Sequence, residues 1–95
     1  MRTIWKYTLN ANWNPLEVPV GYKVLSVIEQ YDEIVMYLLV DPSNETEKAE
    51  FFVSGTGIYL EDSIDELEFV GTVSTYRGSL ICHVFKNNIL KRGLQ

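Results

Sequence analysis

The sequence predicts a single, mainly β domain of about seven short antiparallel strands, arranged as a sandwich or a small barrel. Three observations lead to this fold class. The chain has 95 residues, which is the usual size of one domain. Aromatic residues make up 13% of it, and such residues favour half-buried pleated surfaces. Apolar and polar residues alternate in short segments, and turn residues separate these segments at intervals of about 8–12 residues.

Four strands are expected in the first half of the chain. In the first, Trp5 and Tyr7 are predicted to face the core, and Pro19 places the second at a sheet edge because proline cannot donate to a ladder. The third and fourth form a hairpin at the centre of the sheet. The predicted ranges of the four strands are 2–9, 16–20, 22–30 and 34–40, with a loop at 10–15 and a tight turn at 31–33.

Three further strands are expected after an Asp41-Pro42 turn. Ala49, Phe51 and Val53 alternate on one face of the first of them. Ser63 and Glu66 have the spacing of a capping box, which predicts at most one short helical turn. The strand ranges are 48–53, 68–74 and 80–85, with a break at 54–57; the domain is expected to cover residues 1–88, with a C-terminal tail at 89–95.

The charge and the residue inventory argue against several functions. A formal net charge of −5 without a Lys/Arg run disfavours direct nucleic-acid binding. Cys82 is the only cysteine and His83 the only histidine, so no disulfide, metal site or cofactor is expected. These two residues are neighbours on a predicted strand and point to opposite faces, which argues against a nucleophilic pair. The sequence therefore predicts a protein that is not an enzyme.

The location of the protein follows from its apolar segments. The longest apolar run, residues 34–40, is far shorter than the roughly 20 residues that span a membrane. The first residues lack the apolar stretch of a signal peptide. A cytoplasmic protein without membrane contact is expected.

A glycine loop is the first candidate ligand site. Gly55, Thr56 and Gly57 combine two glycines with a hydroxyl, a composition that lets backbone N–H groups approach an anion. The alternative is a bend that ends a strand. If the loop binds a small nucleotide-like anion, Arg77 or Lys6 would supply positive charge and Tyr76 would stack on the ligand.

An acidic stretch and a loop tryptophan are candidates for a protein interface. Glu61, Asp62 and Asp65 belong to a run of acids that extends to Glu68 and would attract a basic partner or a divalent cation. The alternative is a solvated loop, because the spacing departs from that of a calcium loop. Trp13 is expected either to anchor an interface or to fold back over the core.

Six short motifs occur in an order that resembles a family of small proteins widespread in bacteriophages and prophages and described as a domain of unknown function. The motifs are Ile4-Trp5-Lys6-Tyr7, Val18-Pro19-Val20-Gly21 with Val24-Leu25-Ser26-Val27, Leu39-Val40-Asp41-Pro42, Gly55-Thr56-Gly57, Phe69-Val70-Gly71-Thr72-Val73 and His83-Val84-Phe85. The resemblance covers residues 4 to 85. Cys82 stands where the family usually has tryptophan, and Lys86 where it usually has an acid.

The resemblance implies a phage accessory protein of the host cytoplasm and brings no assigned reaction. Four hypotheses follow. The first is a non-catalytic module that sequesters a small anionic ligand or modulates a host system. The second is an inhibitor or adaptor that uses its acidic surface against a host protein. The third is a structural homo-oligomer, and the last is an enzyme that uses His83.

Overall fold

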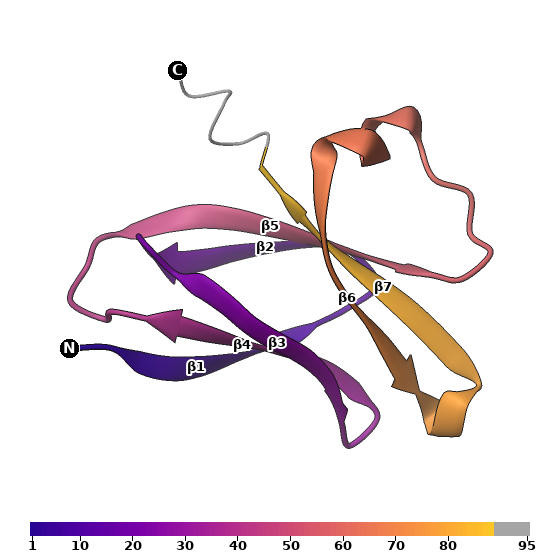
Figure 1. Cartoon of the computed structure of the whole chain (residues 1–95), viewed down its shortest axis with the longest axis horizontal. Coiled ribbons are helices and arrows are strands. Elements are labelled where there is room, and N and C mark those ends of the chain that lie inside the picture. Colours follow the sequence, from indigo (N-terminus) through magenta and orange to yellow (C-terminus); the bar gives the residue numbers. More distant parts are fainter. Residues whose placement is uncertain (89–95) are drawn as a thin grey trace.

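The computed structural model describes residues 1–88 and contains seven strands in two antiparallel sheets (Figure 1). Two short 3-10 helices interrupt them, η1 (Asp62–Glu66) and η2 (Tyr76–Gly78). The strands are β1 (Thr3–Leu9), β2 (Asn12–Pro19), β3 (Lys23–Gln30), β4 (Glu33–Val40), β5 (Thr46–Gly55), β6 (Leu67–Thr75) and β7 (Leu80–Asn87). The predicted mainly β class is confirmed.

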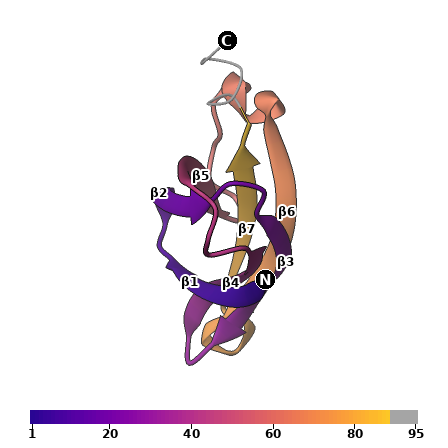
Figure 2. The same ribbon diagram turned by 90° about the vertical axis from the view of Figure 1, so that its left-hand side faces the viewer.

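The two sheets form a sandwich that does not close into a barrel. One sheet has the strand order β1-β4-β3 and the other β2-β5-β7-β6. On one side β1 passes into β2 through Asn10 and Ala11, and on the other side β3 lies beside β6 without joining its ladder (Figure 2). The two strands are close at this edge, since a Cβ added to Gly71 on β6 would lie 3.9 Å from the Cβ of Val27 on β3.

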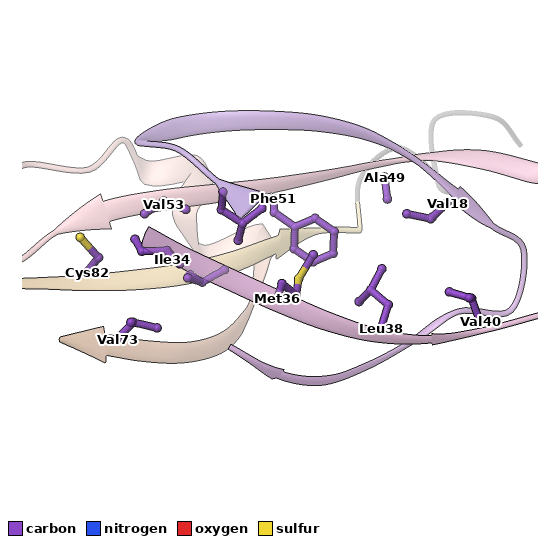
Figure 3. Packing of buried hydrophobic residues seen from close by; sticks show 12 residues of the cluster. Val18, Ile34, Met36, Leu38, Val40, Ala49, Phe51, Val53, Val73 and Cys82 are labelled. Atoms are coloured by element: carbon purple, nitrogen blue, oxygen red, sulfur yellow. The ribbon is translucent and has the colours of Figure 1, made fainter. Parts of the chain in front are cut away.

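The core lies between the two sheets as one layer of apolar side chains (Figure 3). Its largest fully buried members are Phe51 from the four-stranded sheet and Met36 and Leu38 from the three-stranded sheet. Each such side chain contributes about 1.5–3 kcal/mol by leaving water. Tyr7 packs against this cluster, and burial raises the pKa of its hydroxyl.

The hairpin of β3 and β4 is confirmed, with β4 as the centre of its sheet. Tyr31 and Asp32 join the strands with φ angles of 54° and 63°, the pair of left-handed residues that a type I′ turn requires. The Glu29 carboxylate accepts a hydrogen bond from the Asp32 N–H at 2.6 Å. This bond supports a turn that contains no glycine.

The predicted loop at residues 10–15 is wrong from Asn12 onward, because β2 begins there and runs through Pro15. Asn14 is buried, and its side-chain amide donates to the carbonyls of Asn10, Asn12 and Phe51. Its oxygen accepts from the Asn10 N–H at 2.8 Å. A residue type that usually marks a loop therefore holds the corner between the sheets. Pro15 fits because β2 is an edge strand, as predicted from Pro19.

The predicted helical turn exists, but it begins two residues earlier than a capping box at Ser63 would place it. Helix η1 starts at Asp62 after the N-cap residue Glu61, whose side chain makes no capping bond. Ser63 therefore does not cap it, and the capping-box interpretation of Ser63 and Glu66 is wrong in detail. The predicted tail at 89–95 lies outside the described residues.

Candidate functional site

Strand β5 sends two neighbouring phenylalanines to opposite sides of the four-stranded sheet. Phe51 is fully buried in the core, whereas Phe52 is half-buried on the outer side. This alternation is a consequence of the pleat of the strand. Phe52 therefore places an aromatic ring on the outer side of this sheet.

The strand register extends Phe52 into a row of four aromatic rings that crosses the whole sheet. Trp13 on β2 lies opposite Phe52, and Phe85 on β7 lies opposite Phe52 on the other side. Phe69 on β6 completes the row opposite Phe85. The ring centroids of Trp13 and Phe52 are 4.9 Å apart, and those of Phe69 and Phe85 are 5.6 Å apart. We call this outer side of the four-stranded sheet the aromatic face.

The aromatic face is open to solvent at both ends of the row. Trp13 is 48% exposed and Phe69 is 57% exposed. The chain that connects β5 to η1 adds three consecutive exposed apolar residues, Ile58, Tyr59 and Leu60. A contiguous exposed surface of this kind marks an interaction site more often than single exposed apolar residues do.

A cavity of about 220 Å³ lies between the aromatic row and the β5–η1 connection. Trp13 and Phe52 line it from the sheet, and Leu67 lines it from the start of β6. Glu61 is the charged residue of the lining, and the other lining residues are Asn12, Ile58, Tyr59, Leu60, Ser63 and Ile64. The lining thus combines aromatic and aliphatic carbon with a carboxylate.

His83 ties the start of this connection to the sheet. Its Nε2 lies 2.7 Å from the hydroxyl of Thr56, and its Nδ1 lies 3.0 Å from the hydroxyl of Thr72 on β6. Thr56 also contacts the carbonyl of Ile81 through its hydroxyl and its backbone N–H, at 3.3 and 3.0 Å. Neither ring nitrogen faces a carboxylate, and Cys82 is buried on the opposite side of β7. The imidazole of His83 therefore links β7 to β6 and to the turn after β5 through its two hydrogen bonds.

Acidic side chains border the aromatic face beside the cavity. Glu61, Asp62, Asp65 and Glu66 are all exposed. Within residues 1–88 no Lys or Arg side chain forms an ion pair with a carboxylate, since the one ion pair joins the amino terminus to Asp41. The negative charge at this border is therefore not neutralised within the described part of the chain.

The glycine loop does not present all of its backbone donors to solvent. The N–H of Thr56 is donated to Ile81, and that of Ile58 is donated to the carbonyl of Gly55 at 3.4 Å. Gly57, with φ of 89° and no atom within 4 Å of a Cβ position, forms the open part of the turn. Fewer donors remain for an anion than the sequence alone indicates.

The structure places one of the residues that were expected to accompany this loop, Lys6, on the other sheet. Lys6 lies on β1 opposite Tyr37, on the outer side of the three-stranded sheet, because its neighbour Tyr7 packs on the core. Tyr76 and Arg77 form the tip of the β6–β7 hairpin, with φ angles of 49° and 55°. By contrast, the structure brings Trp13 and Glu61 together around one cavity.

Three members of the aromatic row were not selected from the sequence, namely Phe52, Phe69 and Phe85. The adjacency of Phe51 and Phe52 on a strand was a usable signal, because one of two neighbours must face outward. The alignment of Phe69 with Phe85 was not accessible, because the ladder of β6 shifts between Phe69 and Gly71.

Two further findings on residues 1–88 concern metal binding and membrane crossing. This part of the chain contains no group of three or more His, Cys, Asp or Glu side chains that could hold a metal ion. None of its helices has the length and apolar character needed to cross a membrane.

The fold and its outer face define a small antiparallel β-sandwich with an exposed aromatic surface. The chain belongs to the family described as "Domain of unknown function (DUF7352)", whose model matches residues 1–92. No curated protein and no solved structure matches the chain.

Proposed function

We propose that the protein is a non-catalytic interaction module that binds a protein surface of mixed apolar and cationic character through its aromatic face. The single observation that supports this proposal is the row of Trp13, Phe52, Phe85 and Phe69 across all four strands, bordered by acids without internal partners. Aromatic rings supply most of the binding energy in protein interfaces, and charges at the rim select the sign of the partner.

The motif resemblance extends this proposal to a phage setting. A phage accessory protein in the host cytoplasm would use this face to inhibit or redirect a basic host protein. The partner would place an aliphatic or aromatic side chain on the row and a Lys or Arg side chain toward Glu61. A cation near aromatic rings and a carboxylate gains from both.

Sequestration of a small nucleotide-like anion receives less support from the geometry. The Thr56 N–H is already donated to Ile81, and Lys6 lies on the other sheet. An anion placed on the aromatic face would also meet the acids at its border. We therefore favour the protein partner.

Two synthetic peptides test the proposed charge preference. One alternates lysine with leucine, and the other alternates glutamate with leucine at the same length. We expect only the lysine peptide to shift the amide resonances of Phe52 and Phe85 and the indole resonance of Trp13, with an affinity that falls as salt rises. Phe52→Ala should remove this response, and Ile28→Ala on the opposite sheet should retain it.

The proposal would be abandoned if both peptides bound equally, or if the resonance shifts lay away from the aromatic face. Shifts confined to residues 55–57 with the glutamate peptide would instead return the glycine loop to first place.

A further inference from the structure

The outer side of the three-stranded sheet differs in charge from the aromatic face. Ile4, Leu39 and Lys23 lie side by side in one row of this sheet, and Lys6, Tyr37 and Ser26 lie in the next. We call this surface the basic face. Arg2 precedes it along β1. Its acidic neighbours are Glu33 at the hairpin end and Asp41, which follows β4 at the other end and pairs with the amino terminus.

The basic face also carries apolar groups that accompany its charge. Ile4 is 56% exposed, and Ile28, which lies opposite Val35, is 44% exposed. Leu39 is half-buried between Ile4 and Lys23. Lys6 and Lys23 are exposed and form no ion pair within residues 1–88. This face therefore has the apolar and cationic chemistry that the aromatic face is proposed to bind.

The two faces do not cover each other within one molecule; they adjoin only at the edge where β3 lies beside β6, where Lys23 and Phe69 line one groove. They are the outer sides of two sheets whose inner sides share the core, so they point in opposite directions (Figure 2). Two copies of the chain, however, can place the basic face of one against the aromatic face of the other. Such contact would bring Lys6 and Lys23 of one copy near the acids around Glu61 of the next.

We propose that the occupant of the aromatic face is a second copy of this chain, docked through its basic face. The inference rests on the proposed function, because the same aromatic face does the binding. The interface is head-to-tail, so each dimer retains one free face of each kind and further copies add to either end. The protein thus forms short chains or closed rings.

The size of the basic face sets the strength of this contact. Three strands at a spacing of about 4.8 Å and eight residues at about 3.3 Å each give a surface of about 380 Å². Two such surfaces bury about 760 Å² in total, below the roughly 1,200 Å² at which stable complexes begin. Association is therefore weak, dependent on protein concentration and sensitive to salt.

Two variants, each with one face changed, provide the test. Lys6→Glu alters the basic face, and Trp13→Lys alters the aromatic face; both side chains are exposed. Sedimentation of the full chain up to millimolar concentration should show association of the wild-type protein that weakens as salt rises. Each variant alone should remain a monomer. A mixture of the two should form a one-to-one dimer and nothing larger, because each retains the face that the other lacks.

Arg77→Glu is the matched control, because it makes the same charge change as Lys6→Glu at the hairpin tip and should associate like the wild type. Near-ultraviolet circular dichroism and thermal unfolding of each variant establish that it is folded. If a variant is not folded, Lys23→Glu replaces the variant of the basic face and Phe69→Lys replaces the variant of the aromatic face.

Three results would overturn the inference. A wild-type chain that stays monomeric at every concentration removes the second copy and leaves the proposed function to the peptide experiment. Dimers that survive Lys6→Glu but not Trp13→Lys indicate symmetric pairing of two aromatic faces. Association that survives Lys6→Glu and is lost when the chain ends at Asn88 assigns the aromatic face to residues 89–95, which contain Lys91 and Arg92.

Discussion

The outer sides of the two sheets are built by the same alternation, yet they differ in what they expose. At the centre of the basic face, Val35 is only 2% exposed, between Thr8 and Ile28 on the neighbouring strands. On the aromatic face the rings themselves form the surface, and Trp13 remains 48% exposed. On the basic face the strands therefore cover Val35, whereas Ile4 and Ile28 remain 56% and 44% exposed as separate aliphatic side chains. The exposed rings at the two ends of the row are typical of an interaction surface, as proposed above for the aromatic face.

The largest expected effect compares the two sides of one strand. Phe51→Ala should lower the free energy of unfolding by about 3–5 kcal/mol, because it leaves a cavity in the shared core. Phe52→Ala should lower it by at most about 1.5 kcal/mol, because this ring is half-buried on the aromatic face. Urea unfolding followed by tryptophan fluorescence measures both. Equal losses would mean that the aromatic row is part of the folding core and not a binding surface.

The second effect concerns the tie at His83. His83→Ala removes two hydrogen bonds and should lower the free energy of unfolding by about 1–3 kcal/mol. Because Thr56 begins the β5–η1 connection, amide hydrogen exchange at Thr56 should accelerate.

Two matched variants separate the hydroxyl from the shape of Thr72. Thr72→Ser keeps the hydroxyl and should retain protection at the Thr56 amide, whereas Thr72→Val should lose part of it. Unchanged exchange at Thr56 in His83→Ala would show that the Ile81 contacts alone hold this connection.

Within residues 1–88, the basic face has a single side-chain hydrogen bond between strands where His83 makes two. The Tyr37 hydroxyl donates to the side-chain oxygen of Gln30 at 3.0 Å, so Tyr37→Phe should cost about 0.5–1.5 kcal/mol. Tyr31→Phe is the control, because that ring is 90% exposed at the hairpin turn and should have no measurable effect. A Tyr37→Phe loss as large as that of His83→Ala would remove the difference in cross-strand bonding between the two faces.

The smallest effect lies outside both faces, after the end of β4. The Ser43 hydroxyl and then its backbone N–H donate to the Asp41 carboxylate, at 2.6 and 3.0 Å, and hold the pKa of that carboxyl below its ordinary value. The resulting stabilisation is present above the ordinary Asp pKa and is lost as the pH falls through the lowered one. In an NMR titration, Ser43→Ala should raise the pKa of Asp41 toward its ordinary value without altering peptide binding. An unchanged pKa would assign the shift to the Ser43 backbone N–H and the amino terminus.

Most of the secondary structure could be predicted because its causes are local. The alternation of Ala49, Phe51 and Val53, the apolar run of β4 and Pro19 of β2 each specify a strand and its environment. The error at residues 10–15 occurred because a contact with a residue far away in the sequence determines the local conformation. Asn14 behaves as a strand residue because the carbonyl of Phe51 accepts one of its hydrogen bonds.

The candidate site was predictable only in its separate parts. Trp13 and Glu61 were selected from the sequence for different reasons, and they line one cavity. Lys6 and Thr56 were grouped as one ligand site, and the structure places Lys6 on the three-stranded sheet and Thr56 in the turn after β5 of the other sheet. Distance along the chain does not indicate which sheet a strand joins, and sheet membership decides which side chains meet.

The sequence by itself determined the class of fold, the strands of the central hairpin and the excess of negative charge, because these depend on residue type and short-range periodicity. Only the tertiary structure aligned Trp13, Phe52, Phe85 and Phe69 in one row and placed Lys6 on the opposite side of the sandwich. The physical reason is the register of the ladders, which is set by the packing of the shared core between the sheets.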